Sequence, residues 1–409
     1  MKSKIARIGC LSLCSLVVAC RPSGETAELP GAAWYPEEIV SPDERRQEVT
    51  AKQFRLIELA HRHGLSGVLL LRPDNFAWIT GGGFTSGPRC AHPPAAVFVR
   101  EDGRRFLFAA ADEVGRNLAA EMGSLGYASR LIPFSGEVFQ PPEAVLSELS
   151  GGRAFGSDTP RDSARMLARE ISGLRVPLTR WEVRKYRWLG NKCAEAADSV
   201  CRRIRPWMTD RGIEAEVAGL LGRHAIQLQE ARVVADCPVP GSAVRKVEKY
   251  AVVNISASRW GLLVALARAV HIGPVSRELR ERHEALASVQ AGYWAQTRPG
   301  ERAVDIFRGG VAAYTACGHA DAWEHGPQGG RIGYERREWT VTAGADQEVG
   351  ENQAFAWRPS IQDAVTEDTV LLDGDRFVVL TEIPGWPVIE RKAIGRIYRI
   401  PGLLVIESQ

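Results

Sequence analysis

Hydrophobic positions in the first half of the chain recur with two different spacings. Residues 46–64 carry apolar side chains at helical spacing, and residues 67–71 form a short apolar run typical of a buried strand. The same reading predicts strands at 95–100, 105–110, 127–133 and 153–157, and helices at 112–122 and 161–174. Short strands that alternate with helices predict an α/β layer domain over residues 46–177.

The second half has longer helical segments and ends in short strands. Helical spacing covers 181–203 and 212–228, with a break at Pro206, and returns at 276–296 and 303–317. Strand patterns are found at 250–255, 262–270, 354–359, 368–372, 376–380, 395–399 and 403–407. We therefore predict an α+β domain over residues 178–409, with two helix pairs and a curved antiparallel sheet.

The first twenty residues have the pattern of a targeting segment. Lys2, Lys4 and Arg7 precede a twelve-residue apolar stretch at 8–19, which is short for a membrane span but suits a signal-peptide core. A small residue before Cys20 resembles the bacterial lipobox, which implies acylation of Cys20. Two alternatives are an ordinary signal peptide with an incidental cysteine and a buried N-terminal helix.

Residues 21–45 are polar, contain proline and lack clear periodicity, so a tether is predicted there. Together with the lipobox, this predicts a protein of the cell envelope, lipid-anchored to a membrane and facing its extracytoplasmic side. Five cysteines follow Cys20. Because five is odd and none forms a CxxC pair, we expect lone buried thiols rather than a disulfide framework or a zinc site.

Composition agrees with two globular domains: the chain has 409 residues, of which 45% are hydrophobic and 25% are charged. Lys and Arg exceed Asp and Glu by three (52 against 49), and the three basic residues of the targeting segment match this surplus. The remainder is near neutral, which argues against a dedicated nucleic-acid binder. No run of 18 apolar residues occurs, so a spanning helix is not expected.

Three local sequence words, in this order, resemble the pita-bread hydrolase family of aminopeptidase P, prolidase, methionine aminopeptidase and creatinase. They are NFAWITGG at 75–82, EHGPQGGRIGYERRE at 324–338 and QAFAWRPSIQDAVTEDT at 353–369. The resemblance covers about residues 50–400. It implies a creatinase-like α/β N-terminal domain followed by a pita-bread C-terminal domain, and a possible homodimer.

Active members of that family hold two divalent ions with two Asp, one His and two Glu. The matching places in this chain are Asn254, Ala265, Pro327, Arg358 and Glu367. Only Glu367 keeps the ligand, although His325 stands two residues before Pro327. Asn is a poor substitute for a bridging carboxylate, and Arg358 brings a permanent positive charge. The resemblance therefore implies a member without a working dimetal centre, with no metal and no cofactor.

Creatinase is the family's metal-free enzyme, and its example suggests roles for the polar residues. His325 could act as a general base, with Glu367 or Glu338 orienting it, while Tyr334 stabilises an oxyanion. Arg358 and Arg337 could clamp a substrate carboxylate. Trp260 and Trp357, which flank the former ligand strands, could line an apolar pocket.

A purely structural interpretation of the same residues is also open. His325 would cap a loop, Glu338 and Arg337 would form an exposed pair, and Arg358 would replace the missing ion as a salt-bridge partner of Glu367.

Three functions follow from these alternatives. The first is a metal-independent hydrolase or lyase of C–N bonds in a small amino-acid-like substrate, or a catalytically retired peptidase relative. The second is a protein that binds a small peptide or amino-acid derivative. The third is an active metal-dependent Xaa-Pro aminopeptidase or dipeptidase. The expected partners are a small molecule or short peptide and, through the lipid, a membrane, with no nucleic acid.

Overall fold

The computed structural model describes residues 39–83, 95–134, 139–374 and 376–407. Residues 1–20 with Cys20, most of the predicted tether, and Cys90 lie outside the described residues. The first helix, α1 (Pro42–Arg62), begins inside the range predicted as tether. Ser41 and Glu44 bond each other's backbone N–H groups in a capping box, which fixes the start of α1 at this point.

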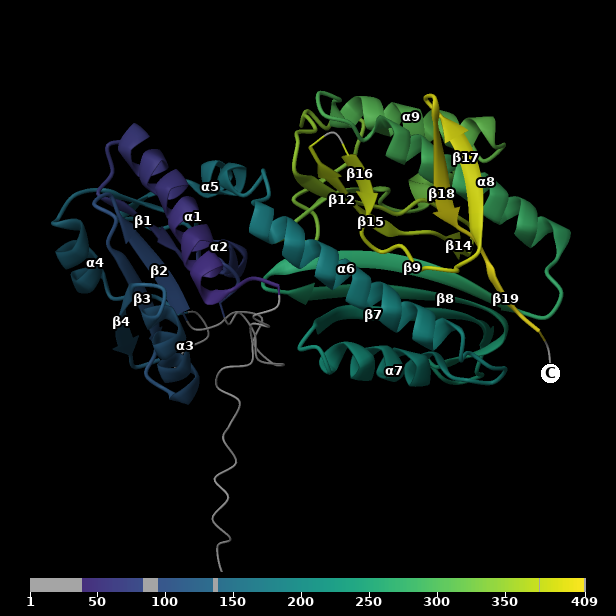
Figure 1. Cartoon of the computed structure of the whole chain (residues 1–409), viewed down its shortest axis with the longest axis horizontal. Helices are drawn as coiled ribbons and strands as arrows, with labels where there is room; N and C mark the ends of the chain where they lie inside the picture. The colour runs from purple at the N-terminus through teal and green to yellow at the C-terminus, as the bar shows by residue number, and fades with distance from the viewer. Residues whose placement is uncertain (1–38, 84–94, 135–138, 375, 408–409) are drawn as a thin grey trace, which may run out of the picture. The chain divides into compact units, whose positions relative to one another are not determined.

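The N-terminal sheet is mixed and has six strands in the described part of the chain. The strands are β1 (Gly67–Leu70), β2 (Ala95–Arg100), β3 (Arg105–Ala110), β4 (Tyr127–Ile132), β5 (Phe155–Ser157) and β6 (Ala164–Met166). Their order is β4-β3-β2-β1-β5-β6, and only the β1–β2 and β2–β3 pairs are antiparallel. Its helices are α2 (Pro73–Ile79), α3 (Glu113–Gly123), α4 (Glu143–Ser150) and α5 (Ala168–Leu174). Alternation of strands and helices thus gives the predicted α/β layer (Figure 1).

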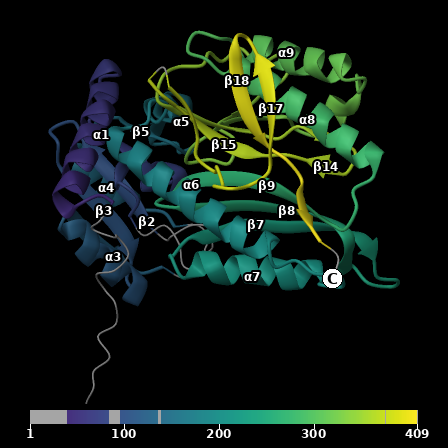
Figure 2. The same ribbon diagram turned by 45° about the vertical axis from the view of Figure 1, so that its right-hand side comes forward.

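The C-terminal part begins with two helices on a long-stranded sheet. The elements are α6 (Arg180–Cys201), α7 (Asp210–Gly222), β7 (Gln227–Pro238), β8 (Arg245–Arg259), β9 (Leu262–Ile272) and β19 (Leu404–Ile406). The strands lie in the order β19-β9-β8-β7, and β19 runs parallel to β9. Both views show α6 and α7 covering one face of this sheet (Figures 1 and 2).

A second sheet lies beside β9 and is joined to it by an isolated bridge between Ala267 and Glu367. Its five strands, in the order β11-β10-β12-β15-β16, are all antiparallel. They are β10 (Gly329–Ile332), β11 (Trp339–Thr340), β12 (Gln353–Trp357), β15 (Asp368–Asp373) and β16 (Arg376–Val379). Two ribbons, β13 (Ser360–Ile361) with β14 (Ala364–Val365) and β17 (Val388–Ala393) with β18 (Arg396–Pro401), and the helices α8 (Arg277–Gln296), α9 (Ala303–Ala316) and η1 (Ala322–His325) complete this part.

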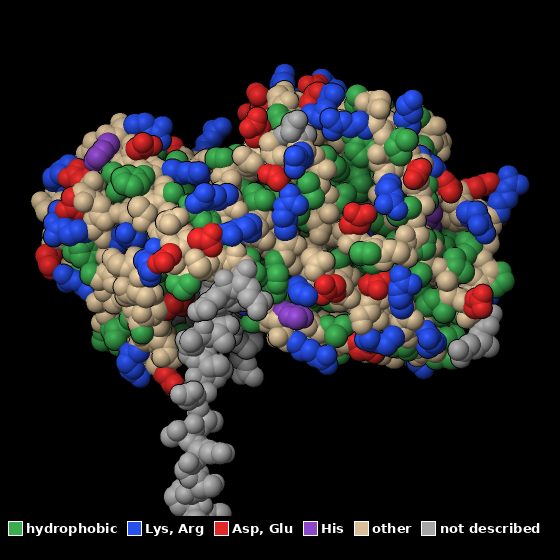
Figure 3. Space-filling model, in the orientation of Figure 1, with side chains coloured by type: hydrophobic (Ala, Val, Ile, Leu, Met, Phe, Trp, Pro, Cys, Tyr) green, Lys and Arg blue, Asp and Glu red, His purple; other side chains and the backbone are tan. Residues whose placement is uncertain are grey.

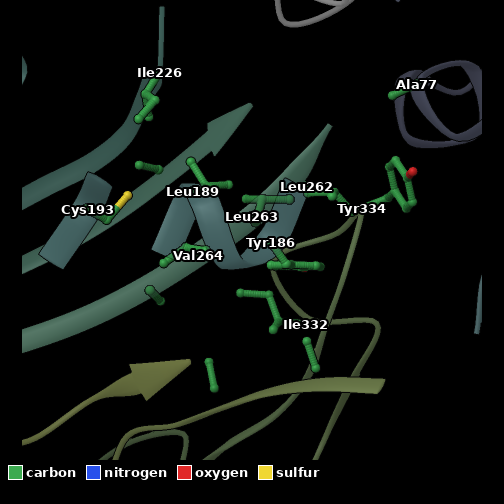
Figure 4. Packing of buried hydrophobic residues seen from close by; sticks show 14 of the residues in the cluster. Ala77, Tyr186, Leu189, Cys193, Ile226, Leu262, Leu263, Val264, Ile332 and Tyr334 are labelled. Atoms are coloured by element: carbon green, nitrogen blue, oxygen red, sulfur yellow. The ribbon is translucent and has the colours of Figure 1, made fainter. Parts of the chain in front are cut away.

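The apolar face of α6 explains how the helix is held on its sheet. Tyr186, Leu189 and Cys193 are fully buried and pack towards Leu262 and Val264 of β9 (Figure 4). Burial raises the pKa of Cys193 to about 12. The described cysteines are free, which agrees with the expectation of lone thiols, although Cys237 and Cys317 are only half-buried.

Several segments differ from the sequence prediction. Residues 161–174 hold a strand before the helix, because β6 extends the sheet by pairing with β5. The helix predicted at 212–228 ends at Gly222, and Ala225 turns the chain in a left-handed conformation into β7. β7 itself, α4 and β17 were not predicted, since their mixed burial gives weak periodicity.

Among the described residues, no helix is long and apolar enough to span a bilayer. Positive and negative side chains are interspersed over the face shown in Figure 3.

Gly190 of α6 gives a test of this packing. A Cβ at Gly190 would lie 2.4 Å from the Leu380 carbonyl oxygen, whereas nothing lies within 4 Å of one at Gly219 in α7. Gly219→Ala should stabilise the protein by about 0.5–1 kcal/mol, because alanine favours the helix. Gly190→Ala should instead destabilise it by about 1–3 kcal/mol, because the backbone of residue 380 must move. Urea unfolding measures both, and equal signs would contradict the packing.

Candidate functional site

An arginine connects two of the positions that the family resemblance assigns to metal ligands. Arg358 Nη2 donates to Asn254 Oδ1 at 3.1 Å, and Arg358 Nε lies 3.3 Å from Glu367 Oε2. Asn254 is on β8, Arg358 directly follows β12, and Glu367 directly precedes β15. The salt bridge that the structural interpretation predicted for Arg358 is therefore present.

The backbone around Glu367 explains how the chain brings these residues together. The Ala267 N–H donates to the Glu367 carbonyl oxygen at 2.9 Å, which forms a bridge between β9 and the start of β15. Two residues further along the chain, the Thr369 hydroxyl accepts a hydrogen bond from the Ala265 N–H and donates one to the Ala265 carbonyl, each at 2.8 Å. Small side chains on β9 thus let the second sheet come close to the first, and they contribute no charge to the site.

A second arginine reaches the same carboxylate. Arg337 Nη2 lies 3.1 Å from Glu367 Oε1. The Glu367 side chain is 4% exposed, while those of Arg337 and Arg358 are 19% and 25% exposed. Two guanidinium groups against one buried carboxylate leave one positive charge, and it is partly open to solvent. The predicted exposed pair of Arg337 with Glu338 is wrong, because Arg337 binds Glu367 instead.

Ser256 is a residue of this site that the sequence analysis missed. It lies two positions after Asn254 on β8, on the same face of the strand, and is paired in register with Ala265. Its hydroxyl is buried and has no hydrogen-bond partner among the described residues. The alternation of polar residues in Asn-Ile-Ser at 254–256 is the signal that could have found it.

Solved structures of known proteins share this architecture. The dipeptidase PepE of Mycobacterium ulcerans matches with a TM-score of 0.66 and 16% sequence identity, over 89% of this chain and 99% of that one. The prolidase of Pyrococcus horikoshii OT3 matches with a TM-score of 0.65 and 16% identity, over 81% and 98%. The chain has the prolidase fold. This confirms the predicted creatinase-like N-terminal domain followed by a pita-bread C-terminal domain.

The prolidase fold also occurs in a protein whose name describes no peptidase. The N-terminal domain of the FACT complex subunit SPT16 from Cicer arietinum (chickpea) matches with a TM-score of 0.59 and 12% identity, over 84% of this chain and 97% of that one. No protein-family model and no curated protein matches this sequence. At these identities the likeness establishes the fold, and the activity must be argued from the side chains.

The residues present do not fit the two divalent ions that the prolidase fold suggests. Among the described residues, no group of three or more His, Cys, Asp or Glu side chains is placed to hold a metal ion. At the site itself, Glu367 is the one carboxylate of the five aligned places, and the Arg358 guanidinium already contacts it. A dication beside that guanidinium would be repelled.

No contact among the described residues places His325 beside Glu367, where it was predicted to act as a base. It ends the short helix η1, is exposed, and its side chain forms no hydrogen bond or ion pair with the described residues. The neighbouring Gln328 is buried and accepts a hydrogen bond from the Tyr314 hydroxyl at 2.8 Å. The prediction that His325 caps a loop is likewise without a supporting contact.

Tyr334 and Glu338 were predicted to act beside Glu367, but the structure gives their side chains other partners. The Tyr334 hydroxyl accepts a hydrogen bond from Lys52 Nζ at 3.1 Å and donates to Glu182. Glu338 Oε2 accepts from Arg175 Nη2 at 2.8 Å. Both therefore belong to ionic clusters that link α1, α5 and α6 to the loop before β11.

Trp260 and Trp357 do not line this site either. Trp260 lies in the turn between β8 and β9, in a left-handed conformation, with its ring 5.3 Å from that of Trp188. Trp357 is fully buried and stacks between Tyr293 at 5.2 Å and Phe355 at 5.9 Å. Both are core residues, which leaves Arg337, Arg358 and Glu367 as the predicted site residues that come together.

Proposed function

We propose that this protein is a catalytically retired member of the prolidase fold that binds a small peptide or amino-acid derivative through its carboxylate. The observation that carries the proposal is the pair of partly exposed guanidinium groups on the single buried carboxylate of Glu367. Two arginines with one residual positive charge suit a carboxylate, which each guanidinium can meet with parallel N–H donors.

The same geometry speaks against the hydrolase alternatives. A hydrolase needs a base within hydrogen-bond reach of the substrate or its water, and Glu367 is engaged by two guanidinium groups. The metal-dependent alternative needs a ligand set that the described residues do not supply. The compartment in which the protein would meet its ligand depends on the lipid anchor at Cys20. That anchor stays a prediction.

Replacing Arg337 tests the binding proposal. Dipeptides with a free C-terminal carboxylate should bind in calorimetric titration, and their C-terminal amides should bind at least about tenfold more weakly, since the guanidinium contact is charge-assisted. Arg337→Met should weaken binding of the free acids by about 10–100-fold and leave the amides unchanged.

Arg336→Met is the matched control, because Arg336 is half-exposed and pairs with Glu230 rather than Glu367. Elemental analysis after incubation with manganese, cobalt or zinc should find no retained ion. Retention of about two ions per chain, or dipeptide binding that ignores the carboxylate, would overturn the proposal.

A further inference from the structure

A third arginine, Arg232 of β7, stands beside the site formed by Arg337, Arg358 and Glu367. It is paired in register with Asn254 of β8, and the Asn254 side-chain oxygen binds Arg358 Nη2 at 3.1 Å. Residues directly opposite each other on adjacent strands carry their side chains on the same face, with Cβ atoms about 4.5–5.5 Å apart. The Arg232 side chain therefore leaves the sheet on the face that carries this site.

The burial pattern of β7 gives the same direction for Arg232. Val233 and Ala235 are buried in the core cluster that also contains Ile213 and Val217 of α7. Successive side chains of a strand point to opposite faces of the sheet. Arg232 therefore points away from α7, towards the second sheet's side of β8.

The Asn254 amide sets the spacing between two of the arginines. Its Nδ2 donates to the Arg232 backbone carbonyl at 3.0 Å, while its Oδ1 accepts from Arg358 Nη2. The Arg358 guanidinium is thus held close to the strand position from which Arg232 projects. An arginine has a long, flexible stem, so the Arg232 guanidinium can reach the space beside that of Arg358.

Arg232 is also available to a ligand. It is exposed, and its guanidinium forms no hydrogen bond or ion pair with the described residues. Arg337 and Arg358, by contrast, share the carboxylate of Glu367. The three guanidinium groups therefore carry two positive charges in excess of Glu367, and a ligand can meet Arg232 without any movement of the core.

Glu230, the acid nearest to Arg232 along β7, does not cancel this excess. It is paired in register with Ser256, so its side chain leaves the sheet on the same face as Arg232. Arg336 Nη1 already lies 2.5 Å from Glu230 Oε2, and this ion pair balances the charge of the acid. One ligand carboxylate would thus still leave one positive charge at the site.

We propose that Arg232 is a specificity-determining residue of this site and that it selects ligands with a second carboxylate close to the first. A peptide with an acidic C-terminal residue has this arrangement: its main-chain carboxylate binds at Arg337 and Arg358, and its side-chain carboxylate binds at Arg232. The inference rests on the binding function proposed above and names the class of its ligand.

Two dipeptides of nearly the same shape test the selection in the full chain. Alanyl-glutamate and alanyl-glutamine differ in one charge, and calorimetric titration at low ionic strength compares their affinities. The wild type should bind alanyl-glutamate at least about tenfold more tightly. Arg232→Met should lower the affinity for alanyl-glutamate to that for alanyl-glutamine and leave the latter within about twofold of wild type.

Arg223→Met is the matched control, because Arg223 is an exposed arginine at the end of α7, on the other face of the sheet. This variant should keep the preference for alanyl-glutamate. Equal affinities for the two dipeptides in the wild type, or a preference that survives in Arg232→Met, would overturn this inference and leave the proposed function standing. A preference lost equally in Arg223→Met would do the same. Binding of neither dipeptide would overturn both.

Discussion

Glu48→Gln is expected to destabilise the protein by about 3–5 kcal/mol, because it leaves two buried ammonium groups with a single buried carboxylate between them. Glu48 of α1 lies 2.6 Å from Lys52 Nζ and 2.6 Å from Lys185 Nζ, and all three side chains are at most 1% exposed. Glu182 of α6 joins the cluster at 2.8 Å from Lys52 Nζ. Urea unfolding at pH 7 measures the loss.

Replacing the whole cluster provides the control. The control variant combines Glu48→Leu, Lys52→Met, Lys185→Met and Glu182→Gln, which removes these charges together. The amide introduced at position 182 still serves the capping box that starts α6. Such a variant should lose less stability than Glu48→Gln alone, because no unpaired charge is left buried. A single variant that is more stable than the combined one would contradict this account.

The same cluster predicts how wild-type stability depends on pH. Burial acts to raise the pKa of Glu48, but Lys185 and Lys52 outweigh it and hold that pKa at about 2, below its ordinary value of 4.5. The contribution is therefore complete above pH 4.5 and is lost as the pH falls towards 2. Glu48→Gln should lack this part of the pH dependence.

Arg175→Met should cost about 3–5 kcal/mol for a related reason. The Arg175 side chain is 1% exposed and binds Asp74 and Asn75 of α2 together with Glu335 and Glu338 of the loop before β11. Its removal leaves the carboxylates of Asp74 and Glu338, which are 7% and 6% exposed, without their shared cation.

Arg187→Met is the comparison for Arg175. Arg187 also pairs with a carboxylate, Asp373, at 2.7 Å, but its side chain is 44% exposed. An exposed pair contributes about 0–1 kcal/mol, so this variant should unfold close to wild type. Urea midpoints that are equal for the two variants would mean that burial does not set the cost.

The local order of hydrophobic residues was enough to predict most helices, most strands and the division into an α/β and an α+β part, whereas the pita-bread fold was predicted from the family resemblance. The salt bridge of Arg358 with Glu367 was also within reach of the sequence, because a missing cation beside a retained Glu is naturally replaced by a guanidinium. The partners of Tyr334 and Glu338 could not be predicted from the sequence. Tyr334 meets Lys52 across 282 residues and Glu338 meets Arg175 across 163, and no local pattern encodes pairings of that range.

Tryptophan positions show the same limit. Trp357 follows four buried residues of β12 and is itself fully buried, so its ring belongs to the core although the sequence places it next to Arg358. The direction of the Trp260 side chain follows from the left-handed turn that joins β8 to β9. Proximity along a strand predicts which residues are neighbours, whereas the direction of each side chain depends on what packs across the sheet.

Glu367 and Asp368 are consecutive acids that serve opposite sides of the chain, Glu367 towards Arg337 and Arg358 and Asp368 towards Arg268. Because side chains alternate along a strand, a slip of one residue in the register of β15 would exchange the sides to which the two acids point. A substitution at one acid can therefore change its arginine contacts while those of the other acid stay in place. A change of register in this segment would alter both sets of contacts at once.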